Sequence, residues 1–240
     1  MTEDMVSPKA QRRHARKSVK NQRQAARTPK PLQPKTKTQR EYMECLDECD
    51  QVFAIGGAGT GKTYVASRHA IRKLLDGRTE RVVICRPSVA KNKHRQGFLP
   101  GGPLAKQRPW LVPLIEAMKE ECGVGTLDKL MHQGQVEFLA FEYMRGRSIP
   151  NAIIILDEAQ NCDLGDLRMF LTRVGEGSQV IICGDVDQVD IEDSGLARVV
   201  EMVYEHDLSA SVIEFGPDDV VRSQIAREWV RAFSEEPISR

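Results

Sequence analysis

Residues 51–69 join an apolar run to a glycine-rich turn and then to a helical pattern. The turn fits the template G-x-x-x-x-G-K-[S/T], in which glycines let backbone N–H groups point at phosphate oxygens and a helix N-terminus adds its positive end. In this pattern Lys62 reaches the β- and γ-phosphates, and the Thr63 hydroxyl binds Mg²⁺. The sequence therefore predicts a nucleotide-phosphate site made by Gly56, Gly57, Ala58, Gly59, Thr60, Gly61, Lys62 and Thr63.

Two adjacent carboxylates follow the apolar run 152–156. After a phosphate-binding turn, the first of them, Asp157, is expected to hold Mg²⁺ directly or through its waters. The second, Glu158, can orient and deprotonate a water molecule for in-line attack on the γ-phosphorus, whereas a phosphoryl transferase must keep water out. The pair favours hydrolysis, and the alternative is a pair of solvated loop acids without a catalytic role.

A further polar group follows the apolar run 180–183, where the chain reads Gly-Asp-Val-Asp-Gln. Its last residue, Gln188, can hydrogen-bond the γ-phosphate or the attacking water and thereby sense nucleotide cleavage. By itself such a run also fits an ordinary turn. Its position after the strand that carries the two carboxylates favours the sensor.

The elements that must position these groups alternate along the chain. Apolar runs predict strands, and amphipathic patterns predict helices between and around them. The predicted strands are 52–55, 82–85, 136–139, 152–156, 180–183 and 211–215, and the predicted helices are 39–49, 62–75, 104–122, 127–132, 164–174, 196–204 and 222–233. This order predicts an α/β fold with a mostly parallel sheet and helices on both faces, in which strand ends bring the polar groups together at one edge.

Charge divides the chain into two parts. Up to Thr38 there are 11 Lys or Arg residues and 2 acids, whereas the remainder holds 24 basic and 32 acidic residues. The first part has four prolines and no apolar periodicity, so it cannot bury enough surface to offset the entropy of ordering. We expect residues 1–36 to be a disordered basic tail and residues 37–240 to be a single domain.

Three roles fit the basic tail: contact with the phosphate backbone of a nucleic acid, docking on the acidic domain, and organelle targeting. No apolar run approaches the length of a membrane span, and no signal-peptide pattern follows Met1. The six cysteines lack metal-ligand spacing and suit small buried side chains. These features predict a cytoplasmic protein without a membrane partner.

Eight motifs of this chain resemble, in order, those of the PhoH-like protein family. They are the turn 56–63, Arg86-Pro87, Phe98-Leu99-Pro100-Gly101, residues 143–147, residues 157–161, Gly184-Asp185 with Gln188, residues 194–196 and residues 219–222. The resemblance implies a RecA-like P-loop NTPase core related to one domain of superfamily 1 helicases, with ATP and Mg²⁺ as cofactors. It also implies that Gln39 lies near the adenine and that Arg222 stabilises transition-state charge, in its own subunit or in a neighbouring one; an ordinary arginine at a helix start is the alternative.

The expected function is that of an ATPase that depends on nucleic acid, single-stranded RNA above all, or of a helicase-like motor. Since the sequence has room for one RecA-like domain, translocation would need subunits side by side, as in a ring such as a hexamer, with the basic residues 91–95 lining its pore. Two other functions fit the same residues: an ATP-controlled assembly switch without unwinding, and a small-molecule phosphotransferase. Glu158 disfavours the second of these.

Overall fold

The computed structural model describes residues 31–235 except 88–102, 187, 190 and 192. The first 30 residues and the basic segment 91–95 therefore lie outside the described residues, and the predictions made for them are not tested. Residues 31–36, which composition assigned to the tail, are placed: Leu32 is buried in the core, and Thr36 caps the first described helix by accepting a hydrogen bond from the backbone N–H of Gln39. The folded part of the chain thus begins before residue 37.

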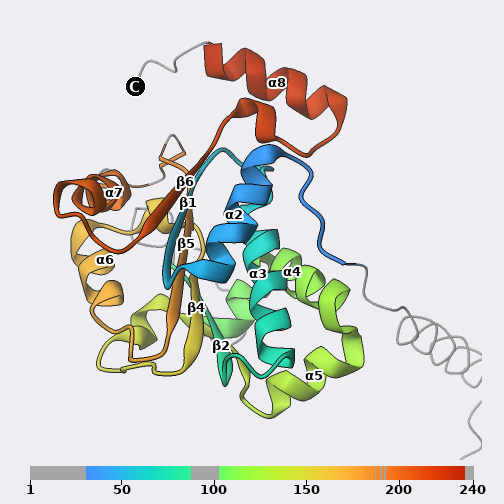
Figure 1. Cartoon of the computed structure of the whole chain (residues 1–240), viewed down its shortest axis with the longest axis vertical. Helices are drawn as coiled ribbons and strands as arrows, with labels where there is room; N and C mark the ends of the chain where they lie inside the picture. Colours follow the sequence, from blue (N-terminus) through green and yellow to red (C-terminus); the bar gives the residue numbers. More distant parts are fainter. Residues whose placement is uncertain (1–30, 88–102, 187, 190, 192, 236–240) are drawn as a thin grey trace, which may run out of the picture.

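A six-stranded parallel sheet forms the centre of the domain, as the alternating pattern predicts (Figure 1). The spatial order is β3-β2-β4-β5-β1-β6. Each strand includes the run predicted for it, and the apolar runs of the four inner strands, β2, β4, β5 and β1, are buried on both faces of the sheet. The strands are β1 (Gln51–Gly56), β2 (Arg81–Arg86), β3 (Val136–Ala140), β4 (Ala152–Leu156), β5 (Gln179–Gly184) and β6 (Ser211–Phe215).

Helices cover both faces of the sheet (Figure 1). One face carries α2 (Lys37–Glu48), α3 (Lys62–Leu75), α4 (Pro103–Cys122) and α5 (Val124–His132), and the other carries α6 (Leu164–Leu171) and α7 (Leu196–Glu205). Alternate strand residues enter the two cores: Val52 and Ala54 of β1 face one, whereas Phe53 and Ile55 face the other.

Six of the seven predicted helices differ from their predicted bounds by one to three residues at an end, and in α6 the cause is local. The helix predicted over 164–174 ends at Leu171, because the backbone of Arg173 and Gly175 bonds to Ile149 and so leaves the helical path. The helix α4 continues through Pro109 and Pro113.

The last described helix, α8 (Gln224–Glu235), lies beyond the carboxyl end of β6 and apart from both helical layers (Figure 1). It begins two residues after Arg222, which leaves that side chain outside the helix. Ile225, Trp229 and Phe233 recur every fourth residue and are each more than 60% exposed. Trp229 stacks on Phe233 with ring centroids 5.7 Å apart. The helix thus presents an apolar stripe to its surroundings.

Candidate functional site

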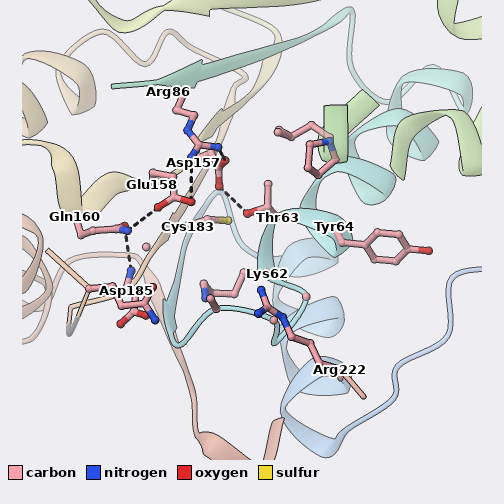
Figure 2. A pocket seen from close by; sticks show the side chains of 17 residues that line it. Lys62, Thr63, Tyr64, Arg86, Asp157, Glu158, Gln160, Cys183, Asp185 and Arg222 are labelled. Atoms are coloured by element: carbon pink, nitrogen blue, oxygen red, sulfur yellow. Dashed lines mark hydrogen bonds and ion pairs between the residues drawn. The ribbon is translucent and has the colours of Figure 1, made fainter. Parts of the chain in front are cut away.

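Five neighbouring strands, β2-β4-β5-β1-β6, end at the same edge of the sheet, and residues at or after each of these ends line one pocket of about 310 Å³. Arg86 ends β2, Asp157 and Glu158 follow β4, and Asp185 follows β5. The glycine-rich turn follows β1, and the segment after β6 leads to Arg222. The predicted convergence of the strand ends is therefore observed (Figure 2).

The glycine-rich turn has a shape that side chains would disrupt. Gly56 has φ +135°, and a Cβ there would lie 2.2 Å from the carbonyl oxygen of Phe215 on the neighbouring strand. Gly59 has φ +88°, and a Cβ there would meet the Arg222 side chain. The turn ends at Gly61, where α3 begins without a side-chain cap. The first N–H groups of α3 thus face the pocket edge as an anion site.

The Lys62 side chain folds back over this turn. Its Nζ donates to the carbonyl oxygens of Gly56 and Gly57, the latter at 2.8 Å, and lies 3.3 Å from Thr60 Oγ1. Burial lowers the pKa of Lys62, although nearby acids act in the opposite direction. The ammonium is therefore held within the turn, where phosphate oxygens would replace carbonyl oxygens as its partners.

The Thr63 hydroxyl and the Asp157 carboxylate meet at the floor of the pocket. Thr63 Oγ1 donates to Asp157 Oδ1 at 2.6 Å, and the other carboxylate oxygen accepts from Arg86 Nη1 at 3.1 Å. Asp157 is 5% exposed. An aspartate and a threonine hydroxyl side by side are the oxygen ligands that Mg²⁺ takes beside a nucleotide.

Glu158 is held by two side chains on either side of it (Figure 2). Arg86 Nη2 lies 3.2 Å from Oε1, and Gln160 Nε2 donates to Oε2 at 2.6 Å. The Gln160 amide oxygen in turn accepts the backbone N–H of Asp185 at 3.1 Å. Glu158 also has φ +56°, a left-handed conformation that costs a non-glycine residue about 1 kcal/mol or more and is common at functional sites.

Gln188 lines the same pocket and is exposed. It lies on the segment after β5, the strand between β1 and β4, so it comes from between the phosphate turn and the carboxylate pair. Its place in the pocket agrees with the predicted sensor of the γ-phosphate, and that role stays a prediction.

Arg222 lies over the phosphate turn of its own chain. It lines the pocket, and its side chain covers Gly59. The backbone N–H of Val221 donates to the carbonyl oxygen of Gly59 at 2.9 Å and fixes this approach. Arg222 therefore lines the pocket of its own chain, and its role in catalysis stays a prediction.

Gln39, expected near the adenine, is not among the residues that line the pocket. Its side chain is 3% exposed, and its Nε2 donates to the carbonyl oxygen of Thr60 at 2.8 Å while its Oε1 accepts the N–H of Lys35. In this arrangement Gln39 supports the phosphate turn from behind.

Sequence reasoning did not assign roles to several pocket residues. Arg86 and Gln160 appear in the family motifs, but the contact of Arg86 with Glu158 and that of Gln160 with Asp185 depend on the sheet order β2-β4-β5. Tyr64 and Cys183 also line the pocket. Burial raises the pKa of the Cys183 thiol to about 12, which makes it an inert side chain.

The arrangement has the parts needed to hydrolyse a nucleoside triphosphate: an anion-binding turn with a lysine, an oxygen pair for Mg²⁺, an oriented carboxylate, an amide and an arginine. These parts lie within one pocket.

Comparison with known proteins agrees with the motifs. The family model described as "PhoH-like protein" matches residues 31–234. A PhoH-like protein of Bacillus subtilis is 40% identical over 86% of this chain, and Protein PhoH of Escherichia coli K12 is 34% identical over 87%. The chain covers 65% and 60% of the lengths of these two relatives.

Among solved structures, the fold is similar to that of the large terminase from a thermophilic bacteriophage, with a TM-score of 0.53 and 13% sequence identity. The likeness covers 83% of this chain and 50% of the terminase chain. The same terminase has also been solved in complex with ADP, and that structure gives a TM-score of 0.52. At this identity the likeness supports the RecA-like fold that the motifs imply.

Proposed function

The chain belongs to the PhoH-like protein family, and on this premise we propose that it binds and hydrolyses ATP with Mg²⁺ in a reaction that depends on a nucleic acid. One observation carries the hydrolytic part: Glu158, held between Arg86 and Gln160, lies in one pocket with the phosphate turn and the Thr63–Asp157 pair. A carboxylate fixed in this way can orient a water molecule toward the γ-phosphorus.

Mg²⁺ would bind Asp157 and the Thr63 hydroxyl. Within the described part of the chain, no group of three or more His, Cys, Asp or Glu side chains forms a metal site by itself. This suits Mg²⁺, which usually takes only one or two protein carboxylates and completes its shell with phosphate oxygens and water. The ion would neutralise charge that develops on the phosphates.

The nucleic-acid partner that we propose is single-stranded RNA. The support comes from the basic segments 91–95 and 12–20, which suit backbone binding by release of counterions, and from the family resemblance. Only 5% of the residues are aromatic, so binding should tolerate many sequences and depend steeply on salt.

We further propose that the protein acts as a homo-oligomer, in a ring such as a hexamer. A translocating motor works with two RecA-like domains, and subunits side by side in a ring would supply them. The exposed apolar stripe of α8 supports self-association, because contiguous apolar surface of this kind usually marks an interaction site.

The helices of the described residues include none long and apolar enough to cross a membrane.

The deciding experiment measures phosphate release from ATP by the purified protein, with and without single-stranded RNA. Glu158→Gln controls for contaminating ATPases, because it keeps the size of the side chain and removes the base. We expect RNA to stimulate phosphate release severalfold in the wild type. The rate of phosphate release by the variant should be at least about a hundredfold lower than that of the wild type.

Other outcomes point elsewhere. Hydrolysis that Glu158→Gln abolishes but that neither RNA nor single-stranded DNA stimulates would favour the ATP-controlled assembly switch. Stimulation by DNA alone would correct the choice of RNA. Transfer of the phosphoryl group to a small molecule in place of phosphate release would indicate a phosphotransferase.

A further inference from the structure

Tyr64 is the next residue after the Thr63 ligand position and lines the same pocket. It stands on the first turn of α3, and its ring points away from Lys62 and Asp157 (Figure 2). The side chain is 38% exposed although two other helical residues hold it. An aromatic ring that is both fixed and exposed suits contact with a flat ligand.

Two residues fix the ring. Its hydroxyl donates to Glu120 Oε2 at 2.6 Å and accepts from Arg68 Nη1 at 2.9 Å. The Arg68 guanidinium carbon lies 5.6 Å from the ring centroid, and Arg68 is itself 4% exposed and paired with Glu121 at 2.7 Å. Because this network is built on two packed helices, the ring is held in place before any ligand binds, which lowers the entropy cost of stacking.

The pocket has two chemically different ends. The phosphate turn, Asp157 and Glu158 form a polar end, whereas Tyr64 lies on the side away from Asp157 and Glu158 (Figure 2). Pro113 and Leu114 of α4 add apolar surface to the lining of the pocket. A nucleotide has the same division, with charged phosphates at one end and a flat, weakly polar base at the other. With the phosphates on the turn and on Thr63, the rest of the nucleotide extends past the next residue of α3.

We propose that the ring of Tyr64 is the platform on which the base of the bound nucleotide stacks. This inference rests on the proposed nucleotide binding and goes beyond it, because it assigns the part of the site that holds the base. Stacking tolerates any base, so Tyr64 would add affinity for all nucleoside triphosphates without selecting among them. Gln39, buried behind the turn, does not occupy this end of the pocket.

The test compares the binding of ATP, ribose 5-triphosphate and inorganic tripolyphosphate to the full chain in the presence of Mg²⁺. Three variants are compared with the wild type: Tyr64→Leu, which removes the ring and keeps apolar bulk; Tyr64→Phe, which keeps the ring and loses both hydrogen bonds; and Tyr204→Ala. Tyr204 is an exposed tyrosine of α7 outside the pocket, so its variant serves as the matched control.

We expect Tyr64→Leu to weaken ATP binding by about five- to a hundredfold and to leave tripolyphosphate binding within about twofold. Tyr64→Phe should bind ATP within about threefold of the wild type. An equal loss for both ligands would show that Tyr64 only ties α3 to α4, and an unchanged ATP affinity would place the base elsewhere; either result overturns the proposal.

The wild type gives a second readout that needs no variant to fold. If the base stacks, ATP binds at least about fivefold more tightly than ribose 5-triphosphate, and equal affinities would overturn the proposal. A wild-type protein that binds none of the three ligands would refute the proposed nucleotide binding itself, and this inference with it. Failure of the two proposals is therefore distinguishable.

Discussion

Thr63 and Asp157, 94 residues apart in the sequence, are joined by a hydrogen bond of 2.6 Å from the threonine hydroxyl to the carboxylate. The bond connects the first turn of α3 to the end of β4 across the intervening strand β5. It aligns two oxygens toward the place where a cation would lie beside bound phosphates. When Mg²⁺ and nucleotide bind, the Thr63 hydroxyl and the Asp157 carboxylate would both bind the ion in place of this hydrogen bond.

The first prediction concerns the charge of Asp157. Asp157→Asn keeps the shape of the side chain and an oxygen that accepts from Thr63, but it removes the negative charge that attracts Mg²⁺. We expect ATP turnover to fall at least about a hundredfold. Calorimetric titration with ATP, in Mg²⁺ and in EDTA, should show a metal-dependent gain in affinity for the wild type and almost none for the variant. A variant that keeps this gain would exclude Asp157 from metal binding.

The second prediction concerns Gln160, which joins Glu158 to the backbone of Asp185. Gln160→Leu should lower kcat by about tenfold or more while KM changes by less than about threefold, because the residue positions the base and does not bind substrate. Steady-state kinetics checks this split. Gln51→Leu is a matched control. It also removes an amide hydrogen bond, from Gln51 Nε2 to the carbonyl oxygen of Ser209, but this bond lies outside the pocket. A change confined to KM would contradict the positioning role.

The third prediction concerns the subunit in which Arg222 acts. Since Arg222 covers Gly59 of its own chain, Arg222→Ala should reduce kcat by about a thousandfold. Mixing it with Glu158→Gln should restore no activity, because every pocket then lacks one of the two groups. Exchange of subunits is verified with differently tagged wild-type chains. Recovery of activity in the mixture would show that Arg222 serves a neighbouring subunit.

The fourth prediction concerns the pH dependence of stability. His69 is 6% exposed, and burial together with the positive charge of Lys73 lowers its pKa to about 4, despite the opposing carboxylate of Asp47. In the unfolded chain His69 therefore binds a proton below about pH 6.5, whereas in the folded chain it does so only below about pH 4. The stabilisation is fully present above pH 6.5 and is lost on acidification, by about 3 kcal/mol in total.

Urea unfolding of the wild type and His69→Gln at pH 7 and pH 5 measures this contribution. The variant should lose less unfolding free energy between the two values than the wild type does. His206→Gln, which removes an exposed histidine of the segment after α7, should behave as the wild type does. Equal losses in the wild type and His69→Gln would show that His69 is not the group that titrates.

Local sequence pattern predicts most of this fold. The strand runs 152–156 and 211–215 and the helix 62–75 have the predicted bounds, because apolar runs and a glycine turn leave few alternatives. The placement of Asp157 and Glu158 also follows, since parallel strands end at a common edge. The tail boundary did not follow, because the burial of Leu32 depends on a core assembled from distant segments.

The contacts within the pocket depend on features that spacing does not reveal. Arg86 meets Glu158 because β2 is the neighbour of β4, and Gln160 reaches Asp185 because β5 is the other neighbour. Gln39 supports the turn because α2 packs behind α3, and Arg222 covers Gly59 because β6 pairs with β1. The contacts of Arg86, Gln160 and Arg222 require the strand order, and the contact of Gln39 requires the packing of α2 on α3; the sequence patterns leave both open.

The exposed stripe of α8 contains an intrinsic fluorescence probe, Trp229. The chain has two tryptophans, and Trp110→Phe would leave Trp229 as the sole indole. An indole that is 61% exposed emits at long wavelength, and any surface that covers α8 would shift the emission to shorter wavelength. Trp229 lies seven residues after the pocket residue Arg222. A titration with nucleotide, followed by the emission of Trp229, would therefore show whether assembly that covers α8 accompanies nucleotide binding.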